Sequence, residues 1–173
     1  MFPGDFQFQE KRHTKSLQKG DLIYLDFPAD QPEEVEQNNL IIQGLGVKPA
    51  KTYKGKDDYL AVFGGEDIIR TITPDFKVLS QLDSRGLIIT APGKEVDFVS
   101  RFFSPQSGVD EDPVTGSAYT LMIPYWHGIL GKTKLVARQL SFRSGHVECE
   151  LIKDRVLIGG KTARYLEGEI LIQ

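Results

Sequence analysis

The sequence predicts one domain of the α/β class, in its α+β form, with a mostly antiparallel sheet curled around a central apolar helix. Three observations predict it. Residues 117–129 are apolar on nearly every side, so a helix there must be covered by other elements. Short alternating runs separated by turn residues follow Gly131 and are typical of an antiparallel meander. Strands and helices alternate before residue 117, and 173 residues suit one domain, or at most two small ones.

The first half of the chain is predicted to contain strands and two short helices. Residues 20–28, GDLIYLDFP, alternate apolar and polar side chains up to a proline and predict a strand. Residues 30–46 place a proline and two acids in a first turn, followed by an apolar face and glycines, and predict a helix. The runs AKTYKG and DYLAVFG predict two strands around the turn GKDD. Residues 73–83 predict a short helix that Thr73 or Asp75 caps.

The second half is predicted to hold the central helix and most of the sheet. Residues 85–93 and 97–105 predict buried strands. The helix over 117–129 contains Pro124, which should kink or divide it. The runs KLVARQLSFRSG, HVECELIK, RVLIGG, TARYLEG and EILIQ then predict the meander. We expect the apolar side chains of the helix to be covered on most sides: Leu121, Met122, Ile123, Tyr125, Trp126 and Ile129.

Composition and charge exclude several classes of function. The formal charge is −3 and basic residues are scattered, so we expect no nucleic-acid partner. No apolar stretch approaches the roughly 20 residues that cross a membrane. The first residues do not resemble a signal peptide, so we expect no membrane contact and a cytoplasmic location. The single cysteine, Cys149, excludes an internal disulfide, and its alternating face with Val147 and Leu151 predicts an inert core thiol.

The stretch SPQSGVDEDPVTGSAYTLMIPYW predicts the functional site. A helix that begins near Thr115 leaves the N–H groups of its first turn without internal partners, and these donors together with the helix dipole favour an anion. Gly116, Ser117 and Ala118 are small enough for a ligand to approach the backbone, and Thr115 or Ser117 could add a hydroxyl contact. Asp112, just ahead, could cap the helix or exchange a proton with a bound carboxylate.

The residues alone leave a second interpretation open, in which a capped helix simply packs closely through its small side chains. Two further interpretations fit less well. A metal site at Asp110, Glu111 and Asp112 lacks a nearby histidine and the alternating spacing of a calcium loop, so we expect no metal. Ser117 lacks the G-x-S-x-G elbow and an assigned base that a nucleophilic serine needs.

Three segments in order resemble the C-terminal half of the PhzF-like family, named for phenazine biosynthesis. They are FFSPQSGVDEDPVTGSAYTLMIPYW, ARQLSFRSG and RVLIGGKTARYLEGEI, and the resemblance runs from about Gly20 to the C-terminus. It implies the diaminopimelate-epimerase-like fold, in which two pseudo-symmetric halves each wrap a sheet around a central helix and close over a cleft. It also implies isomerisation or epimerisation of a small carboxylated metabolite by proton transfer, without a cofactor.

The resemblance implies a role for individual residues. Asp112 becomes a proton-handling or orienting acid, Gly116 and Ser117 bind the anion at the helix end, and Gln139 and Arg143 support the site. Two positions depart from the family pattern. Tyr119 stands where the family usually has histidine, which is expected to alter what lies under the ligand. Ser144 interrupts the usual R-G-G, which is expected to be a milder change in a strand or turn.

The family's N-terminal segments, roughly N-L-S-E-T with its acid/base glutamate and G-H-A-T with its histidine, do not occur in this sequence. We therefore expect residues 1–19 to be a leader or the remnant of an inter-domain connection, and residues 20–173 to be the family's C-terminal domain. Apolar surface that faces the missing half should promote association, so we expect a homodimer. Two hypotheses follow: an isomerase domain, incomplete as given, or a non-catalytic module for anion binding or dimerisation.

Overall fold

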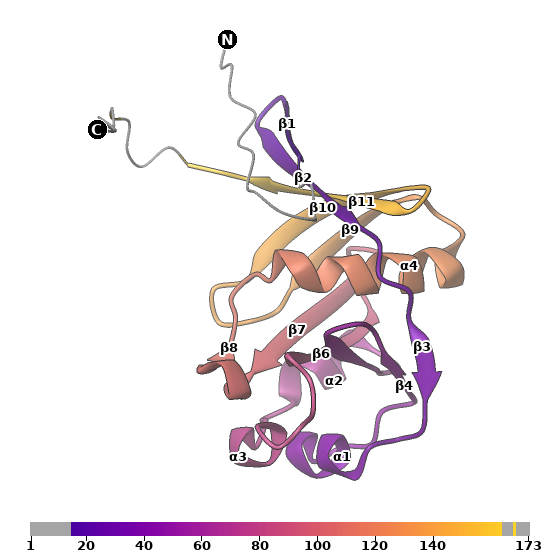
Figure 1. The fold of residues 1–173 in the computed structure, drawn as a ribbon, viewed down its shortest axis with the longest axis vertical. Helices are drawn as coiled ribbons and strands as arrows, with labels where there is room; N and C mark the ends of the chain where they lie inside the picture. The colour runs from indigo at the N-terminus through magenta and orange to yellow at the C-terminus, as the bar shows by residue number, and fades with distance from the viewer. Residues whose placement is uncertain (1–14, 164–167, 169–173) are drawn as a thin grey trace.

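The computed structural model of the protein describes residues 15–163 and 168 (Figure 1). The strands are β1 (Lys15–Lys19), β2 (Leu22–Pro28), β3 (Glu33–Val35), β4 (Lys51–Lys54), β5 (Asp58–Val62), β6 (Gly86–Pro92), β7 (Phe98–Ser104), β8 (Val109–Glu111), β9 (Lys134–Gln139), β10 (Gly145–Ile152) and β11 (Arg155–Lys161). The α-helices are α1 (Asn39–Leu45), α2 (Glu66–Thr71), α3 (Phe76–Leu79) and α4 (Tyr119–Leu130), and 3-10 turns cover η1 (Pro105–Ser107) and η2 (Gly116–Ala118).

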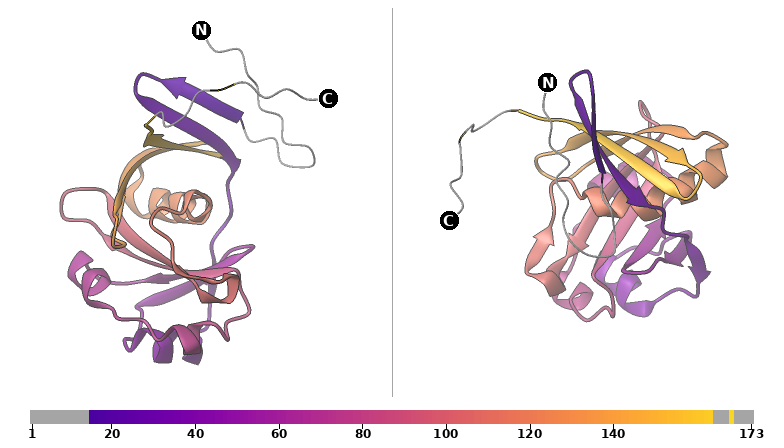
Figure 2. Two further views of the ribbon diagram at one scale, coloured as in Figure 1. Left: turned by 90° about the vertical axis from the view of Figure 1, so that its left-hand side faces the viewer. Right: turned by 45° about the horizontal axis from the view of Figure 1, so that its top comes forward.

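In the described part of the chain all the strands belong to one sheet. Its order is β1-β2-β11-β10-β9-β7-β6-β5-β4-β3, and β8 pairs with β7 outside this path. Most neighbours are antiparallel, whereas β5 with β6 and β7 with β9 are parallel. The sheet curves around α4, which is seen nearly end-on in the left view of Figure 2. The predicted fold class, a mostly antiparallel sheet curled around an apolar helix, is confirmed.

The core inside the curve is built on α4. Trp126 is 2% exposed and its ring stacks on Phe98 of β7, with centroids 5.3 Å apart. The Trp126 Nε1–H donates to Thr90 Oγ1 on β6 at 3.0 Å, so the buried indole is hydrogen-bonded. Cys149 of β10 belongs to the same core, which confirms the predicted core thiol. Burial raises the pKa of this thiol, so the reactive thiolate is suppressed.

A second core lies on the other face of β5, β6 and β7, beneath α1, α2 and α3 (Figure 1). Ile41 of α1, Ile69 of α2 and Leu79 of α3 are completely buried there. The central strands are therefore covered on both faces, which accounts for their nearly continuous apolar sequences. No helix in the described part of the chain is long and apolar enough to span a membrane.

Pro124 was predicted to kink or divide the central helix, and it does not divide it. A proline has no N–H to donate to the carbonyl four residues earlier, which here belongs to Thr120. That carbonyl instead accepts a hydrogen bond from the Asp30 backbone N–H at 3.0 Å, so α4 continues unbroken from Tyr119 to Leu130. Ile129 is 60% exposed, which corrects its assignment to the covered face.

The predicted helix over 30–46 is wrong in its first half. Glu33 and Glu34 belong to β3, which pairs with β4, and helix α1 starts only at Asn39. The reason is local: the Asn38 side chain accepts a hydrogen bond from the Leu40 N–H at 2.8 Å and fixes the helix start there. Helix α2 was not predicted at all.

Both ends of the described region modify the predicted boundaries. Residues 15–19, assigned to the leader, form β1 and pair with β2, so the sheet begins before Gly20. Residues 1–14 of that leader lie outside the described residues. The predicted strand in TARYLEG falls mostly, and that in EILIQ wholly, outside them as well. The other predicted strands and the short helix capped by Asp75 are confirmed.

Candidate active site at the start of the central helix

The loop ahead of α4 is held by one buried amide side chain. Gln139, at the end of β9, has no exposed surface. Its Nε2 donates to the Asp112 carbonyl at 2.7 Å, and its Oε1 accepts from the Thr115 N–H at 3.0 Å. One side chain therefore satisfies backbone groups at both ends of the D-P-V-T segment. Ser141 adds a hydrogen bond from its hydroxyl to the Pro113 carbonyl, 2.5 Å away.

Asp112 does not cap the helix with its carboxylate. Its Oδ2 accepts a hydrogen bond from the Thr115 hydroxyl at 2.6 Å, and no side chain caps the backbone at Thr115. Thr115 is buried, and its hydroxyl is engaged by Asp112 inside the loop rather than facing a ligand. Asp112 is half-buried, so the carboxylate stays reachable while Thr115 fixes its orientation. Thr115 acts on the site through Asp112.

Gly116 is the open position of the loop. A side chain built on it would meet no atom within 4 Å, so a ligand has room beside the backbone. Gly116 and Val114 form part of the wall of a cavity of about 690 Å³, together with the sheet face around Gly159 and Gly160 of β11. This volume lies within the range of about 300 to 1,000 Å³ that is usual for small-molecule sites.

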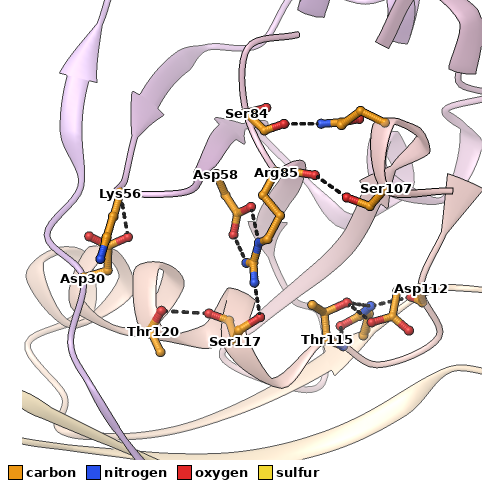
Figure 3. A network of polar contacts seen from close by, with 12 residues as sticks. Asp30, Lys56, Asp58, Ser84, Arg85, Ser107, Asp112, Thr115, Ser117 and Thr120 are labelled. Atoms are coloured by element: carbon orange, nitrogen blue, oxygen red, sulfur yellow. Dashed lines mark hydrogen bonds and ion pairs between the residues drawn. The ribbon is translucent and has the colours of Figure 1, made fainter. Parts of the chain in front are cut away.

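Ser117 lies at the edge of a second cavity, of about 330 Å³, and contacts a residue that the sequence did not indicate. The Arg85 Nη1 donates to Ser117 Oγ at 2.7 Å (Figure 3). The same guanidinium binds Asp58 through two hydrogen bonds, one from Nε to Oδ1 at 2.9 Å and one from Nη2 to Oδ2. Burial raises the pKa of Asp58, and the Arg85 guanidinium opposes that rise. This ion pair places a positive group against the first turn of the helix.

Two predicted positions turn inward. Ala118 has no exposed surface and packs in the core, so we remove it from the set of ligand-contacting residues. Tyr119, in place of the family's usual histidine, is also fully buried, with its ring 6.2 Å from that of Phe98. The substitution therefore changes the core behind the helix start and not the surface beneath a ligand.

Arg143 does not support the loop. It lies exposed in the turn between β9 and β10, and none of the described residues forms a hydrogen bond or ion pair with it. Its neighbour Ser144 adopts a positive φ of 53° and donates its hydroxyl to the Gln139 carbonyl at 3.0 Å. The arginine that contacts the site is Arg85. The described residues contain no cluster of three or more acids, histidines or cysteines placed to bind a metal.

A comparison with known families identifies the family of this chain. The model of the phenazine biosynthesis-like protein family matches residues 11–168. The chain belongs to this family. An uncharacterized isomerase of Pseudomonas aeruginosa is 45% identical over 152 residues, covering 88% of this chain and 58% of the relative. An uncharacterized isomerase of Halalkalibacterium halodurans is 40% identical over 157 residues, covering 89% of this chain and 59% of the relative. The chain thus spans about three-fifths of the length of these PhzF relatives.

Solved structures of the PhzF family agree with the fold described above. A PhzF-family protein of Enterococcus faecalis superposes with a TM-score of 0.84 at 38% identity, covering 96% of this chain and 67% of the other. A putative PhzC/PhzF protein of Clostridium difficile gives a TM-score of 0.82 at 35% identity, with coverages of 94% and 66%. The chain has the diaminopimelate-epimerase-like fold of the PhzF family.

The sequence analysis named the residues of the loop before α4 but did not indicate the Asp58–Arg85 ion pair beside it. Arg85 lies 27 residues from Asp58 and 32 residues from Ser117, so no spacing within a strand or helix links the three. Their meeting depends on the parallel pairing of β5 with β6, which brings Asp58 beside Gly86 and hence beside Arg85. The Arg85 N–H also donates to the Asp57 carbonyl at 2.7 Å, which fixes the backbone from which the guanidinium extends.

Proposed function

We propose that this chain supplies one side of the active site of a PhzF-like isomerase, which moves a proton on a small carboxylated metabolite without a cofactor. The observation that carries the proposal is the loop from Asp112 to Ser117, held by Gln139 at the start of α4 in a chain of this family. Gly116 leaves the backbone open to a carboxylate, because no atom lies where a side chain would be. Unpaired N–H groups at a helix start favour a negative charge.

Asp112 is the proposed proton carrier on this side of the substrate. Its Oδ2 is fixed by Thr115 at 2.6 Å, and none of the described residues donates a hydrogen bond to the other oxygen. An oriented carboxylate with one free oxygen can accept a proton from a carbon beside a bound carboxyl group and return it. Isomerisation with inversion or relocation of a proton also needs a second acid/base group on the opposite side of that carbon.

The second group is proposed to come from sequence that the longer relatives contain. Supporting this, the chain spans 58% and 59% of two relatives that are named isomerases. A chain with Asp112 alone is expected to exchange protons slowly, and partnership with the remaining part of a PhzF-like protein should accelerate the reaction. A module that binds the anion without turning it over is the alternative function.

Proton exchange distinguishes the two functions. The 173-residue chain would be incubated in D2O with malate, aspartate and glutamate, and loss of the signal from the hydrogen beside a carboxyl group would be followed by proton NMR. If the wild-type chain exchanges this hydrogen and Asp112→Asn lowers the exchange rate at least tenfold, the result supports the isomerase. Asp110→Asn is the matched control, because Asp110 is an exposed acid on β8, whereas the Asp112 carboxylate is half-buried and oriented by Thr115.

Absence of exchange with every probe, combined with binding of the same carboxylates at Gly116, would contradict turnover by this chain and support the binding module. Absence of both exchange and binding would contradict the proposed site itself. Binding is read from the amide shift of Gly116 in a 15N NMR titration, so it does not depend on catalysis.

We also propose that the chain forms a homodimer in which a second copy covers the cavity beside Gly116. Ile23 and Leu25 of β2 are 37% and 38% exposed, and Val114 is 42% exposed, so apolar groups line this cavity and face solvent. Exposed apolar patches of this kind promote association. The arrangement would be the usual dimer of the family or one in which the second copy takes the place of the additional part of the relatives.

Light scattering at tens of micromolar tests the dimer. The wild-type chain should have about twice the monomer mass of 19.4 kDa, and the double change Ile23→Glu and Leu25→Glu should reduce it to the monomer. Ile152→Glu is the control, because Ile152 is 45% exposed at the end of β10 but does not line the cavity. A wild-type monomer at this concentration would contradict the proposal.

A further inference from the structure

The Arg85 side chain uses its donors on two partners at once. Its Nε and Nη2 point to the two carboxylate oxygens of Asp58, and its Nη1 points to Ser117 Oγ, 2.7 Å away (Figure 3). The Asp58 side chain is 5% exposed and the Arg85 side chain is 38% exposed. A two-point ion pair with a buried carboxylate fixes the plane of the guanidinium, so the third nitrogen has a defined direction.

The chemistry of this contact fixes the role of the Ser117 hydroxyl. A guanidinium has five N–H donors and no acceptor, so the oxygen of Ser117 must accept from Arg85. The hydroxyl hydrogen is then left for a different partner. Among the described residues no atom accepts it, although the neighbouring Thr120 hydroxyl donates to the Ser117 carbonyl at 2.7 Å. Ser117 therefore presents a free donor beside the start of α4.

The surroundings of this donor form a small cavity. Ser117, Arg85 and Thr120 line it together with residues 27–30, at and just after the end of β2, and residues 56–58, before and at the start of β5. Its charged residues are Lys56 and Arg85 and the acids Asp30, Asp57 and Asp58; Asp30 accepts from the Lys56 N–H and Asp58 binds Arg85. Its volume of about 330 Å³ is at the lower end for small-molecule sites. A carboxylate oxygen is the acceptor that suits a hydroxyl polarised by a cation, since hydrogen bonds to ionised groups are about twice as strong as neutral ones.

We propose that Arg85, oriented by Asp58, is a positioning residue that makes Ser117 a hydrogen-bond donor for a carboxylate oxygen of the ligand. The proposal rests on the function proposed above and adds a selectivity to it. A ligand whose carboxylate is replaced by a neutral amide should bind much more weakly, because the amide carries no charge for the Ser117 hydroxyl and the nearby guanidinium to stabilise. Arg85 acts through Ser117 and does not itself need to touch the ligand.

The experiment is a 15N NMR titration of the 173-residue chain with propionate and with propionamide, read at the Gly116 and Ser117 amides. Propionate should shift both signals, and propionamide should bind at least tenfold more weakly. Ser117→Ala should weaken propionate binding about tenfold, the effect of one charge-assisted hydrogen bond. Removing Arg85 leaves the Asp58 carboxylate buried without its partner, so the fold is protected by the double change Arg85→Met and Asp58→Asn.

Non-additivity separates positioning from a general loss of structure. Arg85→Met with Asp58→Asn should weaken propionate binding as much as Ser117→Ala does. Adding Ser117→Ala to this double variant should weaken binding no further, because the double change and Ser117→Ala act on the same hydrogen bond. Arg70→Met with Glu66→Gln is the matched control. This ion pair also joins a half-exposed arginine, whose side chain is 49% exposed, to a buried carboxylate, whose side chain is 8% exposed. It lies on α2 and should leave binding unchanged.

Each outcome bears on the proposal. Wild-type selectivity for propionate that persists in the Arg85→Met and Asp58→Asn protein would overturn the positioning role and leave the proposed function intact. Fully additive losses would also overturn it, since Arg85 would then act independently of Ser117. If propionate shifts neither amide of the wild-type chain, the proposed carboxylate site and this inference are both overturned.

Discussion

Replacing Gln139 by methionine should destabilise the protein by about 2 to 5 kcal/mol. The change keeps the length of a side chain with no exposed surface but removes its donor and its acceptor. The Asp112 carbonyl and the Thr115 N–H, 2.7 and 3.0 Å from the amide, then lose their partners. Each buried group left unpaired costs about 1 to 3 kcal/mol, so two would cost about 2 to 6 kcal/mol, and the bond to Asp112 is only partly buried, which lowers the upper limit to about 5 kcal/mol.

Unfolding in urea, followed by circular dichroism, measures this loss. For a domain of this size the melting temperature should fall by about 5 to 15 °C. Gln81→Met is the matched control, because the Gln81 amide donates to the Lys77 carbonyl at an exposed position, and its loss should cost less than about 0.5 kcal/mol. If Gln139→Met unfolds within about 0.5 kcal/mol of the wild type, the buried amide does not hold the loop and the reasoning is refuted.

The acidic substitution at the same position adds a pH dependence. In Gln139→Glu, the ionised side chain keeps an acceptor for the Thr115 N–H but loses the donor to the Asp112 carbonyl, whereas the protonated side chain still has an O–H to donate. Burial should raise the pKa of the new carboxyl group above the usual value of about 4.3. A raised pKa in the folded state means that stability falls as the pH rises through the interval between the unfolded and folded values. Gln139→Glu should therefore be least stable, relative to the wild type, at neutral pH.

Three further predictions follow from the packing. A hydrogen bond from the Lys94 backbone N–H lowers the pKa of Glu66 below its usual 4.5. The stability that Glu66 contributes should therefore be present at neutral pH and lost as the pH falls through the lowered value. In urea unfolding, the difference in unfolding free energy between Glu66→Gln and the wild type should be smaller at pH 3 than at pH 7. Cys149 should react with a thiol reagent only in denaturant, as followed by absorbance, and fast native labelling would contradict its burial. Gly86→Ala would place a Cβ 2.3 Å from the Phe102 ring and should lower the melting temperature by several degrees; an unchanged value would show that this ring moves freely.

Much of the fold could be predicted because its signals are local. The apolar circumference of α4 and the alternation of β9, β10 and β11 each depend on neighbouring residues, and they identified the wrapped helix correctly. The errors have local causes as well. Two acids and a proline before residue 39 are typical of a helix start, but the Asn38 side chain caps the helix later and Glu33 and Glu34 are left to pair in β3.

The site was only partly predictable, because its parts are joined by long-range contacts. The D-P-V-T-G-S-A motif indicated Asp112, Gly116 and Ser117 as site residues, which stays a prediction, and the order of motifs indicated Gln139, which the structure places against this loop. The choice of Arg143 followed the order of motifs along the chain, whereas the arginine that reaches Ser117 is Arg85, just before β6. Arg85 reaches that place only because β5 and β6 run parallel, and one sequence contains no local sign of a parallel pairing.

The start of α4 is fixed from three directions, which bears on how the proposed site would bind a ligand. Gln139 holds the loop from β9, Arg85 holds Ser117 from the segment before β6, and Asp30 holds the Thr120 carbonyl from the segment after β2. The last contact exists because Pro124 cannot use that carbonyl. Donors aimed at a charged ligand are most effective when they need no rearrangement on binding. The proline that was expected to break the helix therefore leaves a carbonyl free for an outside segment, and that segment helps to hold rigid the turn that presents Gly116 and Ser117.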